Sequence, residues 1–370
     1  MIKNVKQTRF RKFMISCLIT IVAIILMVGG AYAAYRVILR PPALPEYEII
    51  RLPVQPPDNP QTPPRGGSIQ PVPRENPSES ENEPPEPEYE DIVFYRREGF
   101  YTFLIYGIDD HGNADVVIIA AYDSIAQTAY LISIPRDTRV DVDRRQGLRK
   151  IFASYPLGRT GGRGHAAGME QFKTELSTLV GFRPDFYIGL NHRGFVRLID
   201  SIGGVTVNVP FHMRYTAMEY DVVILDIDLP AGRQWLNGTQ ALHFVRFRQA
   251  NEGYRAGTDF MRMQRGQEVI NAAVQELLSP RTITRIPELV SNFRANVTTN
   301  LSLDELGWLV TQAPNIQRDA FLSSYTLPIA RTERQGWYEI PDKEATLELV
   351  NRTVNPFTRD ITPEMLRIVE

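Results

Sequence analysis

The stretch FYTFLIYGIDDHGNADVVIIAAYDSIAQTAYLISIPRDTRV, residues 100–140, decides the fold of this chain. It contains three short runs of β-branched, aromatic and other apolar residues, separated by Gly, Asn, Asp and Ser. Runs of this composition between turn residues are typical of β-strands. The stretch therefore predicts three strands joined by turns. Two aspartates flank the first turn, and Pro-Arg-Asp follows the last strand.

Helical and strand patterns alternate through the rest of the chain. Residues 168–181 (GMEQFKTELSTLVG) place apolar side chains on one helix face and end at a glycine. The other predicted elements are strands at 185–190, 205–210, 221–232 and 324–329, helices at 193–204, 259–278, 283–295, 302–313 and 343–353, and a short helix running into a strand at 237–248. Such alternation is typical of layered α/β proteins. We expect one three-layer αβα domain with a central mixed sheet over residues 97–370.

The chain begins with a basic segment followed by an uncharged one. Residues 1–40 carry seven Lys or Arg and no Asp or Glu, and residues 14–35 carry no charge. About 20 apolar residues span a bilayer as a helix, and the basic flank favours a cytoplasmic N-terminus. We expect a cytoplasmic tail at 1–13 and a single transmembrane helix at 14–35, with the rest of the chain outside the cytoplasm. A cleaved signal peptide is the alternative, because AYAA at 31–34 resembles a cleavage site.

A proline-rich, acidic segment comes next. Residues 41–91 hold 15 of the 27 prolines, and 11 Asp or Glu against three Arg. A segment of this composition buries too little apolar surface to form a core. We therefore expect residues 36–96 to be a disordered extracytoplasmic linker that lets the domain work some distance above the bilayer.

Composition excludes several classes of function. The net charge is -2, which is not the strongly basic character of a nucleic-acid-binding protein. The only cysteine, Cys17, lies in the apolar segment, which excludes intrachain disulfides, thiol catalysis and cysteine metal sites. The five histidines have no zinc spacing, and the Gly-rich residues 161–168 lack the Gly-Lys-Ser/Thr of a P-loop.

Asp109 and Asp115 flank the first predicted turn. Their carboxylates could share one divalent cation, and Mg²⁺ prefers a few carboxylates together with waters and phosphate oxygens. The alternative is a polar hairpin turn, in which Asp and Gly only supply the turn geometry.

Arg136 and Asp137 follow the third predicted strand. In open α/β sheets, ligand sites gather beyond the ends of such strands. Pro135 ends the strand pairing and would let Arg136 turn into a site. The alternative is an ion pair that closes the strand end.

A third group of charges is the arginines of residues 243–267. Arg246 and Arg248 are two apart in a predicted strand, so both side chains would point to one face. Arg262 and Arg265 are three apart on the following helix and share a face. Arginines gathered in this way repel one another unless an anion lies between them, although ordinary surface charge is the alternative.

These clusters form one coherent chemistry. Arginine forks bind phosphate oxygens at two points, and a carboxylate-held Mg²⁺ polarises a phosphoryl group. Phosphoryl transfer then needs mainly an acceptor hydroxyl in line. Because the expected anchor places the site outside the cytoplasm, where ATP is scarce, a lipid-linked diphosphate is the expected donor.

At these residues the sequence resembles the LytR-CpsA-Psr family, from about residue 97 to beyond 325. The resemblance is carried by five motifs in the expected order, YGID…D, LISIPRDTRV, DFYIGLNHRGFVRLIDSIGGVTVNVP, LPAGRQWLNGTQALHFVRFR and TDFMRMQRGQ. Members of the family are membrane-anchored enzymes that transfer anionic glycopolymers, such as wall teichoic acid or capsule, from undecaprenyl pyrophosphate to peptidoglycan.

The resemblance implies roles for particular residues. Asp109 and Asp115 would hold Mg²⁺, with Mn²⁺ as a substitute, and Asp115 would help to deprotonate a muramic acid hydroxyl. The polyprenyl tail would lie in an apolar tunnel between sheet and helices. The implied pyrophosphate-binding residues are Arg136, Arg246, Arg248, Arg262, Arg265 and Gln267, of which the first three are also implied catalytic residues beside Asp115.

The sequence departs from the family pattern near two of these residues. Asn113-Ala114 replaces the usual Arg-Ser before Asp115, and Gly266 replaces the first glutamine of Arg-Gln-Gln. Two other functions therefore stay open. One is a non-catalytic or regulatory binder of polyprenyl-pyrophosphate-linked precursors, and the other is a polyprenyl-pyrophosphate hydrolase with water as acceptor.

Overall fold

The computed structural model describes residues 40–53, 89–109, 111–142, 149–219, 222–247, 259–277, 296–312 and 323–369. The expected transmembrane helix at 14–35 and the expected helix at 283–295 lie outside these residues. In the described part of the chain, no helix has both the length and the apolar character needed to cross a bilayer.

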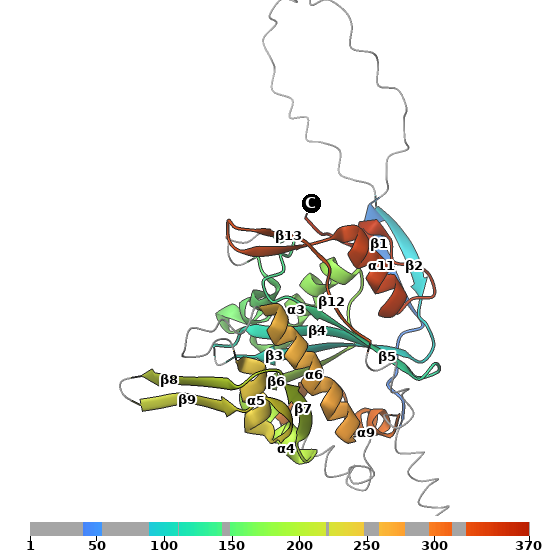
Figure 1. Cartoon of the computed structure of the whole chain (residues 1–370). Helices are drawn as coiled ribbons and strands as arrows, with labels where there is room; N and C mark the ends of the chain where they lie inside the picture. Colours follow the sequence, from blue (N-terminus) through green and yellow to red (C-terminus); the bar gives the residue numbers. More distant parts are fainter. Residues whose placement is uncertain are drawn as a thin grey trace, which may run out of the picture.

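A six-stranded mixed sheet forms the centre of the molecule (Figure 1). Its strand order is β11-β6-β3-β4-β5-β12. The bounds are Phe100–Ile108 for β3, Ala114–Asp123 for β4, Thr128–Ile134 for β5, Phe186–Asn191 for β6, Thr298–Thr299 for β11 and Ser324–Thr326 for β12. β4 is antiparallel to both β3 and β5, whereas β6 is parallel to β3 and β12 is parallel to β5. The predicted α/β class, with a mixed sheet at its centre, is confirmed.

Both faces of the central strand β4 are buried. Val117, Ile119 and Ala121 belong to one hydrophobic core, and the alternating Ile118 and Ala120 belong to another. Because successive side chains of a strand point to opposite faces, layers must cover the sheet on both sides. This explains why β4 reads as a continuous apolar run rather than as an alternating one.

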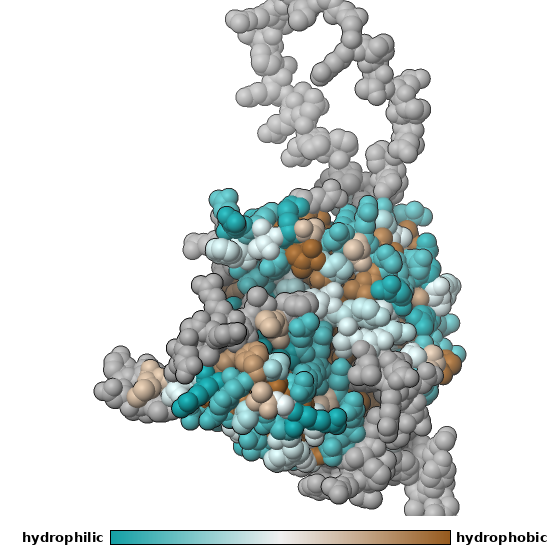
Figure 2. Space-filling view, in the orientation of Figure 1, coloured by the Kyte–Doolittle hydropathy of each residue, from teal (hydrophilic) through white to brown (hydrophobic). Residues whose placement is uncertain are grey.

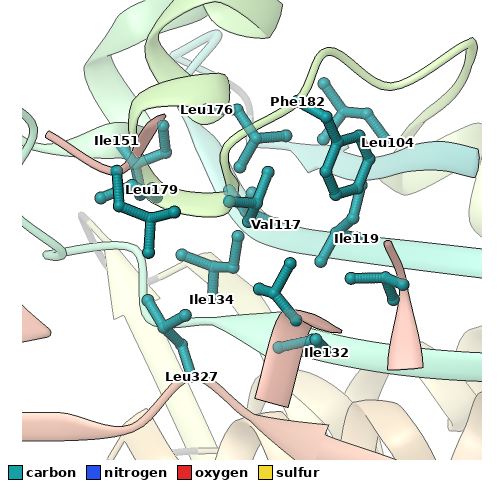
Figure 3. Packing of buried hydrophobic residues seen from close by; sticks show 14 of the residues in the cluster. Leu104, Val117, Ile119, Ile132, Ile134, Ile151, Leu176, Leu179, Phe182 and Leu327 are labelled. Carbon is teal, nitrogen blue, oxygen red and sulfur yellow. The ribbon is translucent and has the colours of Figure 1, made fainter. Parts of the chain in front are cut away.

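The first core is covered by α3 (Gly164–Val180) and α11 (Lys343–Thr353). Figure 3 shows Leu176 and Leu179 of α3 above Val117, Ile119 and other strand side chains. The preceding connection contains the short helical segments η1 (Ile151–Ala153), α2 (Ser154–Gly158) and η2 (Thr160–Gly162), and η4 (Pro363–Met365) follows α11.

The second core is covered by α6 (Asp259–Leu277) and α9 (Leu303–Gln312). Ile270 of α6 and Leu306 of α9 pack against Ile118 and its neighbours in this core. Figure 1 shows α6 and α9 on one side of the sheet and α3 on the other. Figure 2 shows that the visible face is mostly hydrophilic, with hydrophobic residues in small separate patches, so most of the apolar surface is inside.

A third core, which includes Val269 of α6, fills a subdomain built from two antiparallel strand pairs and two helices. Its elements are α4 (His192–Ser201), β7 (Val205–Val209), β8 (Met213–Glu219), β9 (Val222–Leu229), β10 (Gly232–Leu236) and α5 (Gly238–Arg246). β7 pairs with β10, and β8 pairs with β9, both antiparallel. The sequence patterns predicted α4, β7 and β9 but missed β8 and β10.

The described part of the expected linker is not disordered. β1 (Tyr47–Pro53) and β2 (Tyr89–Tyr95) form an antiparallel pair over their full length, and Pro42 is buried against the domain. These strands pack on the domain before residue 97, because Leu52 and Phe94 belong to its first core and Ile50 and Ile92 pack against that core. Residues 54–88 between the two strands lie outside the described residues.

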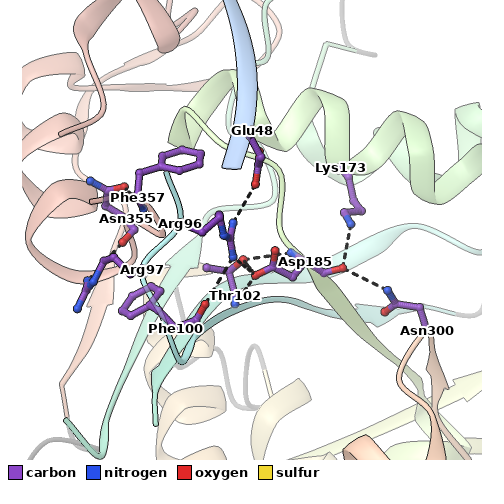
Figure 4. A network of polar contacts seen from close by, with 10 residues as sticks. All are labelled: Glu48, Arg96, Arg97, Phe100, Thr102, Lys173, Asp185, Asn300, Asn355 and Phe357. Carbon is purple, nitrogen blue, oxygen red and sulfur yellow. Dashed lines mark hydrogen bonds and ion pairs between the residues drawn. The ribbon is translucent and has the colours of Figure 1, made fainter. Parts of the chain in front are cut away.

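A buried polar network fastens this strand pair to the sheet (Figure 4). The Arg96 guanidinium, only 3% exposed, pairs with Glu48 of β1 at 3.0 Å and with Asp185 at 2.7 Å. Asp185 also accepts hydrogen bonds from the amide and the hydroxyl of Thr102 in β3. A buried charge is tolerated only when it is paired in this way, so β1, β3 and the start of β6 are fixed to one another.

Two more strands lie beyond the end of β5. β13 (Ile329–Glu333) and β14 (Tyr338–Pro341) form an antiparallel hairpin, and Glu339 bridges to Thr138 after β5. α9 and α11 confirm the predicted helices at 302–313 and 343–353 within a residue or two.

Candidate functional site

Four strand ends meet at one edge of the central sheet. β3, β5 and β6 all run toward this edge, and β4 starts from it. The register pairs Val117 with Ile134, so two residues further along the same edge Asp115 comes opposite Arg136. The strand pairing therefore brings together two sequence-predicted residues from separate motifs.

Asp115 and Arg136 form an ion pair. Arg136 Nη1 donates to Asp115 Oδ1 at 2.8 Å, and both side chains are about 30% exposed. Arg136 Nε also lies 3.7 Å from Asp137 Oδ2, while Asp137 Oδ1 pairs with Lys150 at 2.9 Å. The expected ion pair between Arg136 and Asp137 thus exists, but the contact of Arg136 with Asp115 is shorter. The guanidinium is held by two carboxylates and still reaches solvent.

Asp109 organises the turn between β3 and β4. Its Oδ1 accepts hydrogen bonds from the amides of His111 and Asn113, and its Oδ2 accepts one from the Asn113 side chain. Burial acts to raise the pKa of Asp109, but these hydrogen bonds outweigh burial and lower it. Asp109 is therefore an ionised carboxylate. Its hydrogen bonds confirm the role in the turn, which the sequence left open as the alternative to metal binding.

Arg246 is placed differently from the prediction. It is the last residue of α5, not part of a strand, so the expected strand alternation with Arg248 does not apply. The Asn237 side chain and Gln240 form a capping box that starts this helix, which favours helix through the motif. Arg246 is exposed and lines the cavity described below. Arg248 lies outside the described residues.

Helix α6 presents Arg262, Gly266 and Ile270 at spacings of four residues to this cavity. Arg265 faces elsewhere and is only 5% exposed; its Nη2 donates to the backbone carbonyl of Phe247. Burial first, and then the charge of nearby Arg262, lower the pKa of Arg265 to about 10. Arg265 thus anchors the residue after α5 and does not line the cavity.

Gln267 is also used inside the protein. Its Nε2 donates to Ser133 Oγ at 2.9 Å and to the Tyr325 carbonyl at 3.0 Å, which ties α6 to β5 and β12. The geometry therefore gives Gln267 a positioning role for α6. It is not among the cavity-lining residues, in contrast to its expected contact with pyrophosphate.

A cavity of about 740 Å³ lies between the sheet edge, α5, α6 and the β8–β9 pair. Its charged lining residues are Asp109, Asp115, Arg136, Arg246 and Arg262. The interior is apolar and includes Ile105, Ile118, Leu190, Phe195, Leu225 and Ile270. The site is thus an apolar cavity with charges of both signs at the strand ends.

Several lining residues were missed in the sequence. Tyr215, Leu225 and Ile227 come from β8 and β9, His111 from the turn after β3, and His192 from the start of α4. The strand pattern of residues 221–232 was visible, but nothing in it indicated that this pair would fold over the sheet edge. The spacing of the histidines in the sequence does not indicate a metal site, and no other pattern marks them.

Asp109 and Asp115 supply hard oxygen donors that suit Mg²⁺. The described residues contain no group of three or more His, Cys, Asp or Glu that could hold a metal ion. Two carboxylates are nevertheless enough for Mg²⁺ when phosphate oxygens and waters complete its coordination. Asp109 and Asp115 both line the cavity, so the donor set fits the ion when substrate is bound.

Fold and site define an α/β protein with an apolar cavity of about 740 Å³ and charges of both signs at its strand-end side. The family described as the LytR_cpsA_psr family matches residues 70–354, most of the chain. The chain belongs to this family.

Two curated relatives place the chain more closely. The polyisoprenyl-teichoic acid--peptidoglycan teichoic acid transferase TagU of Oceanobacillus iheyensis is 30% identical over 236 residues, 63% of this chain and 68% of that protein. The regulatory protein MsrR of Staphylococcus aureus is 27% identical over 212 residues, 56% of this chain and 58% of that protein. The chain therefore matches about three fifths of the length of MsrR.

Solved structures share the fold. B. subtilis TagV has a TM-score of 0.54 at 25% identity, covering 70% of this chain and 96% of that one. The structure titled TagT bound to LIIa-WTA has a TM-score of 0.51 at 19% identity, covering 69% and 89%. At that identity the second likeness concerns the fold alone.

Proposed function

We propose that the protein is a membrane-anchored phosphotransferase that moves an anionic glycopolymer from a polyprenyl diphosphate to a peptidoglycan hydroxyl. The observation that carries this proposal is the apolar cavity with Asp115, Arg136, Arg246 and Arg262 among its lining residues. The name of the relative TagU, a polyisoprenyl-teichoic acid--peptidoglycan teichoic acid transferase, supports the substrate class.

The apolar interior suits the prenyl chain of such a donor. Each buried methylene contributes about 0.8 kcal/mol, so a hydrocarbon tail held against Ile105, Phe195 and Ile270 supplies most of the affinity. The same burial fixes the direction of the lipid, with its diphosphate at the charged strand ends.

The arginines suit the diphosphate. Arg136 already has one guanidinium nitrogen 2.8 Å from Asp115 and is about 29% exposed. A planar fork can hold a carboxylate and a phosphate oxygen at once. Arg246 and Arg262 line the same cavity and add positive charge that the bound diphosphate neutralises.

Asp109 and Asp115 would hold Mg²⁺ in the loaded enzyme. The ion would supply charge neutralisation on the phosphoryl oxygens. The residues of the chain do the remaining work of binding and orientation.

In the proposed reaction, the acceptor hydroxyl oxygen forms a bond to the phosphorus that carries the polymer. The bond from that phosphorus to the bridging oxygen breaks, and the bridging oxygen leaves with the lipid monophosphate. Asp115 would accept the proton of the hydroxyl, and Arg136 contacts its Oδ1. Positioning of this kind is the main demand of phosphoryl transfer.

The test is transfer from a defined polyprenyl diphosphate donor by the full chain in detergent, with and without Mg²⁺. Arg136→Ala should lower the rate by about 100-fold, as expected when a charge-stabilising donor is removed. Arg183→Ala is the matched control, since Arg183 is an exposed arginine paired with Glu170 away from the cavity. Full activity in Arg136→Ala would sink the proposal.

Product analysis separates the remaining functions. A transferase forms a polymer–peptidoglycan phosphodiester when peptidoglycan oligomers are present, whereas a hydrolase gives the same products with or without them. A binder without activity would retain the lipid but release neither product. For the membrane location, we propose that residues 14–35 are the anchor and that the domain lies outside the cytoplasm, which protease accessibility in intact cells would test.

A further inference from the structure

A second, smaller cavity lies beyond the end of β5. It has a volume of about 530 Å³ and is formed by the segment after β5 and the β13–β14 hairpin. Its lining residues are Arg139, Arg149, Glu333, Arg334, Gln335 and Tyr338. Backbone hydrogen bonds fix its walls, since the Arg139 amide donates to the Glu339 carbonyl and the Val140 amide to the Arg149 carbonyl.

The lining of this cavity is positively charged. It contains three arginines and one carboxylate, Glu333, which pairs with Arg139 at 3.0 Å. The Arg139 guanidinium also lies 5.6 Å from the centre of the Tyr338 ring, which is buried and forms a floor. Arg334 is exposed at the hairpin turn. The second cavity, called the groove below, is therefore lined by more guanidinium groups than carboxylates, and guanidinium groups suit phosphate.

The hairpin turn that contains Arg334 also carries an exposed aromatic side chain. Trp337 follows Gln335 and Gly336 in the same hairpin turn and is 67% exposed. A flat aromatic ring with a polar edge suits one face of a sugar ring. Arginines next to an exposed tryptophan thus match a ligand that combines phosphate with saccharide.

The second cavity lies close to the candidate active site along the chain. Arg136 at the first cavity and Arg139 at the second are three residues apart, so their Cα atoms are separated by at most about 10 Å. Asp137 between them is fixed by Lys150. Figure 1 shows the hairpin that contains β13 projecting to the same side of the molecule as β8 and β9, which wall the first cavity.

We propose that Arg139, Arg149, Arg334 and Trp337 form a second binding site, for the phosphate-bearing saccharide units of the polymer attached to the donor diphosphate. This inference rests on the proposed function and extends it. The first cavity holds the lipid diphosphate, and the groove holds units of the polymer further from the reacting phosphorus. The enzyme would then select its donor by polymer charge as well as by lipid.

The experiment measures binding of three probes to the full chain in detergent. They are a glycosylated poly(glycerol phosphate) oligomer, a neutral dextran oligomer and inorganic pyrophosphate. The double variant Arg149→Ala/Arg334→Ala should bind the charged oligomer roughly tenfold more weakly, because charge-assisted contacts to phosphate are lost. Pyrophosphate affinity should change less than twofold, and the salt dependence of oligomer binding should become shallower.

Two further variants complete the test. Trp337→Ala should weaken binding of the glycosylated oligomer and leave the affinity for inorganic pyrophosphate unchanged. Arg233→Ala, an exposed arginine on β10 away from the groove, is the matched control for lost surface charge. Unchanged oligomer binding in the arginine double variant, or equal binding of neutral dextran, would overturn the proposal. Absence of transfer together with arginine-dependent oligomer binding would instead count against the proposed function.

Discussion

Asp109 combines a turn role with a proposed metal role in one side chain. Its two oxygens accept three hydrogen bonds within the turn between β3 and β4. An asparagine can keep both backbone contacts through its carbonyl oxygen, whereas an alanine keeps none. The two substitutions therefore separate the turn from the charge.

Asp109→Asn should leave the free energy of unfolding within about 0.5 kcal/mol of the parent, and Asp109→Ala should lower it by about 1–2 kcal/mol. If the carboxylate holds Mg²⁺, both variants lose transfer activity to the same degree. Urea denaturation and the transfer assay measure the two effects. Full activity in Asp109→Asn would restrict Asp109 to the turn.

Gly266 is the departure from the family pattern that the structure explains best. A Cβ atom built on it meets no atom within 4 Å, and the residue lines the cavity. Gly266→Ala should raise the free energy of unfolding by about 1 kcal/mol, because glycine is a poor helix former.

Gly266→Leu should in contrast compete with the lipid tail for the same space. We expect weaker binding of a polyprenyl diphosphate and unchanged binding of inorganic pyrophosphate, measured by calorimetry. Equal losses for both ligands would show that Gly266 does not face the tail.

The residues that sequence reasoning placed correctly are those whose position follows from strand order. Asp115 comes just after the start of β4 and Arg136 just after the end of β5, so an antiparallel β4–β5 pairing brings them near each other. Arg265 and Gln267 were misplaced, because their motif specifies a helix face only when the packing partner of α6 is known. The partners are the Phe247 carbonyl, 18 residues from Arg265, and the Tyr325 carbonyl of the edge strand β12, 58 residues from Gln267.

At the scale of elements, a tyrosine–histidine chain joins the start of α3 to its neighbours. His165 Nδ1 lies 2.9 Å from the Tyr155 hydroxyl, and Nε2 lies 3.1 Å from the Tyr187 hydroxyl of β6. Burial first, and then the charge of Arg159, lower the pKa of His165 below its ordinary value of 6.5. The neutral imidazole is therefore the form that the folded protein prefers.

The Tyr155–His165–Tyr187 contacts predict that the stability of the protein falls at acidic pH. A lowered pKa means that the stability contribution of His165 is fully present above pH 6.5 and is lost as the pH falls through the folded-state pKa. His165→Gln should flatten the decline in the free energy of unfolding between pH 7 and pH 5. Burial lowers the pKa of His243 too, so a smaller slope should remain. Urea denaturation across this pH range tests the point, and an unchanged slope would contradict it.

Sequence periodicity predicted most helices and central strands but not the β8–β9 pair as a cavity wall. Its strands have the composition of many exposed hairpins, and their place depends on packing of α5 and α6 around the third core. Arg246 was assigned to a strand because alternating Phe and Arg suggested one. The capping box at Asn237 and the burial of Phe244 in the third core stabilise a helix that extends to Arg246.

At the scale of the molecule, the strands β1 and β2 enclose the proline-rich residues 54–88. Pro53 pairs with Tyr89, so the two strand ends are adjacent. A two-residue Asn-Gly turn should be able to join them. Replacing residues 54–88 in this way should raise the free energy of unfolding by about 2 kcal/mol, because closing a shorter loop costs less entropy.

Urea denaturation of the shortened chain measures this effect. A chain shortened instead by removal of residues 40–53 is the opposite control, since it loses Glu48 and leaves Arg96 with one partner fewer. That chain should be less stable than the parent. A loss of stability on replacing residues 54–88 would show that they contribute native contacts.

Composition alone failed at this scale. Prolines and acidic residues are spread along all of residues 41–91, so composition does not distinguish the seven residues of β1 from the rest of that segment. Its partner β2 lies a long way along the chain, so no local pattern could reveal the pairing. The mixed sheet, in contrast, was predictable from strands that contain their own turn signals.

The first packed residues of the chain limit the height of the domain above the membrane. Pro42 is buried and Leu44 packs on the core beside α9. With residues 14–35 in the bilayer as expected, residues 36–41 are the whole tether, and six extended residues span at most about 21 Å. The proline-rich segment lies between two strands of the domain and adds nothing to this length. If residues 14–35 are the anchor, the reach of the domain into the cell wall would be set by its own dimensions, and its underside would stay close to the lipid headgroups.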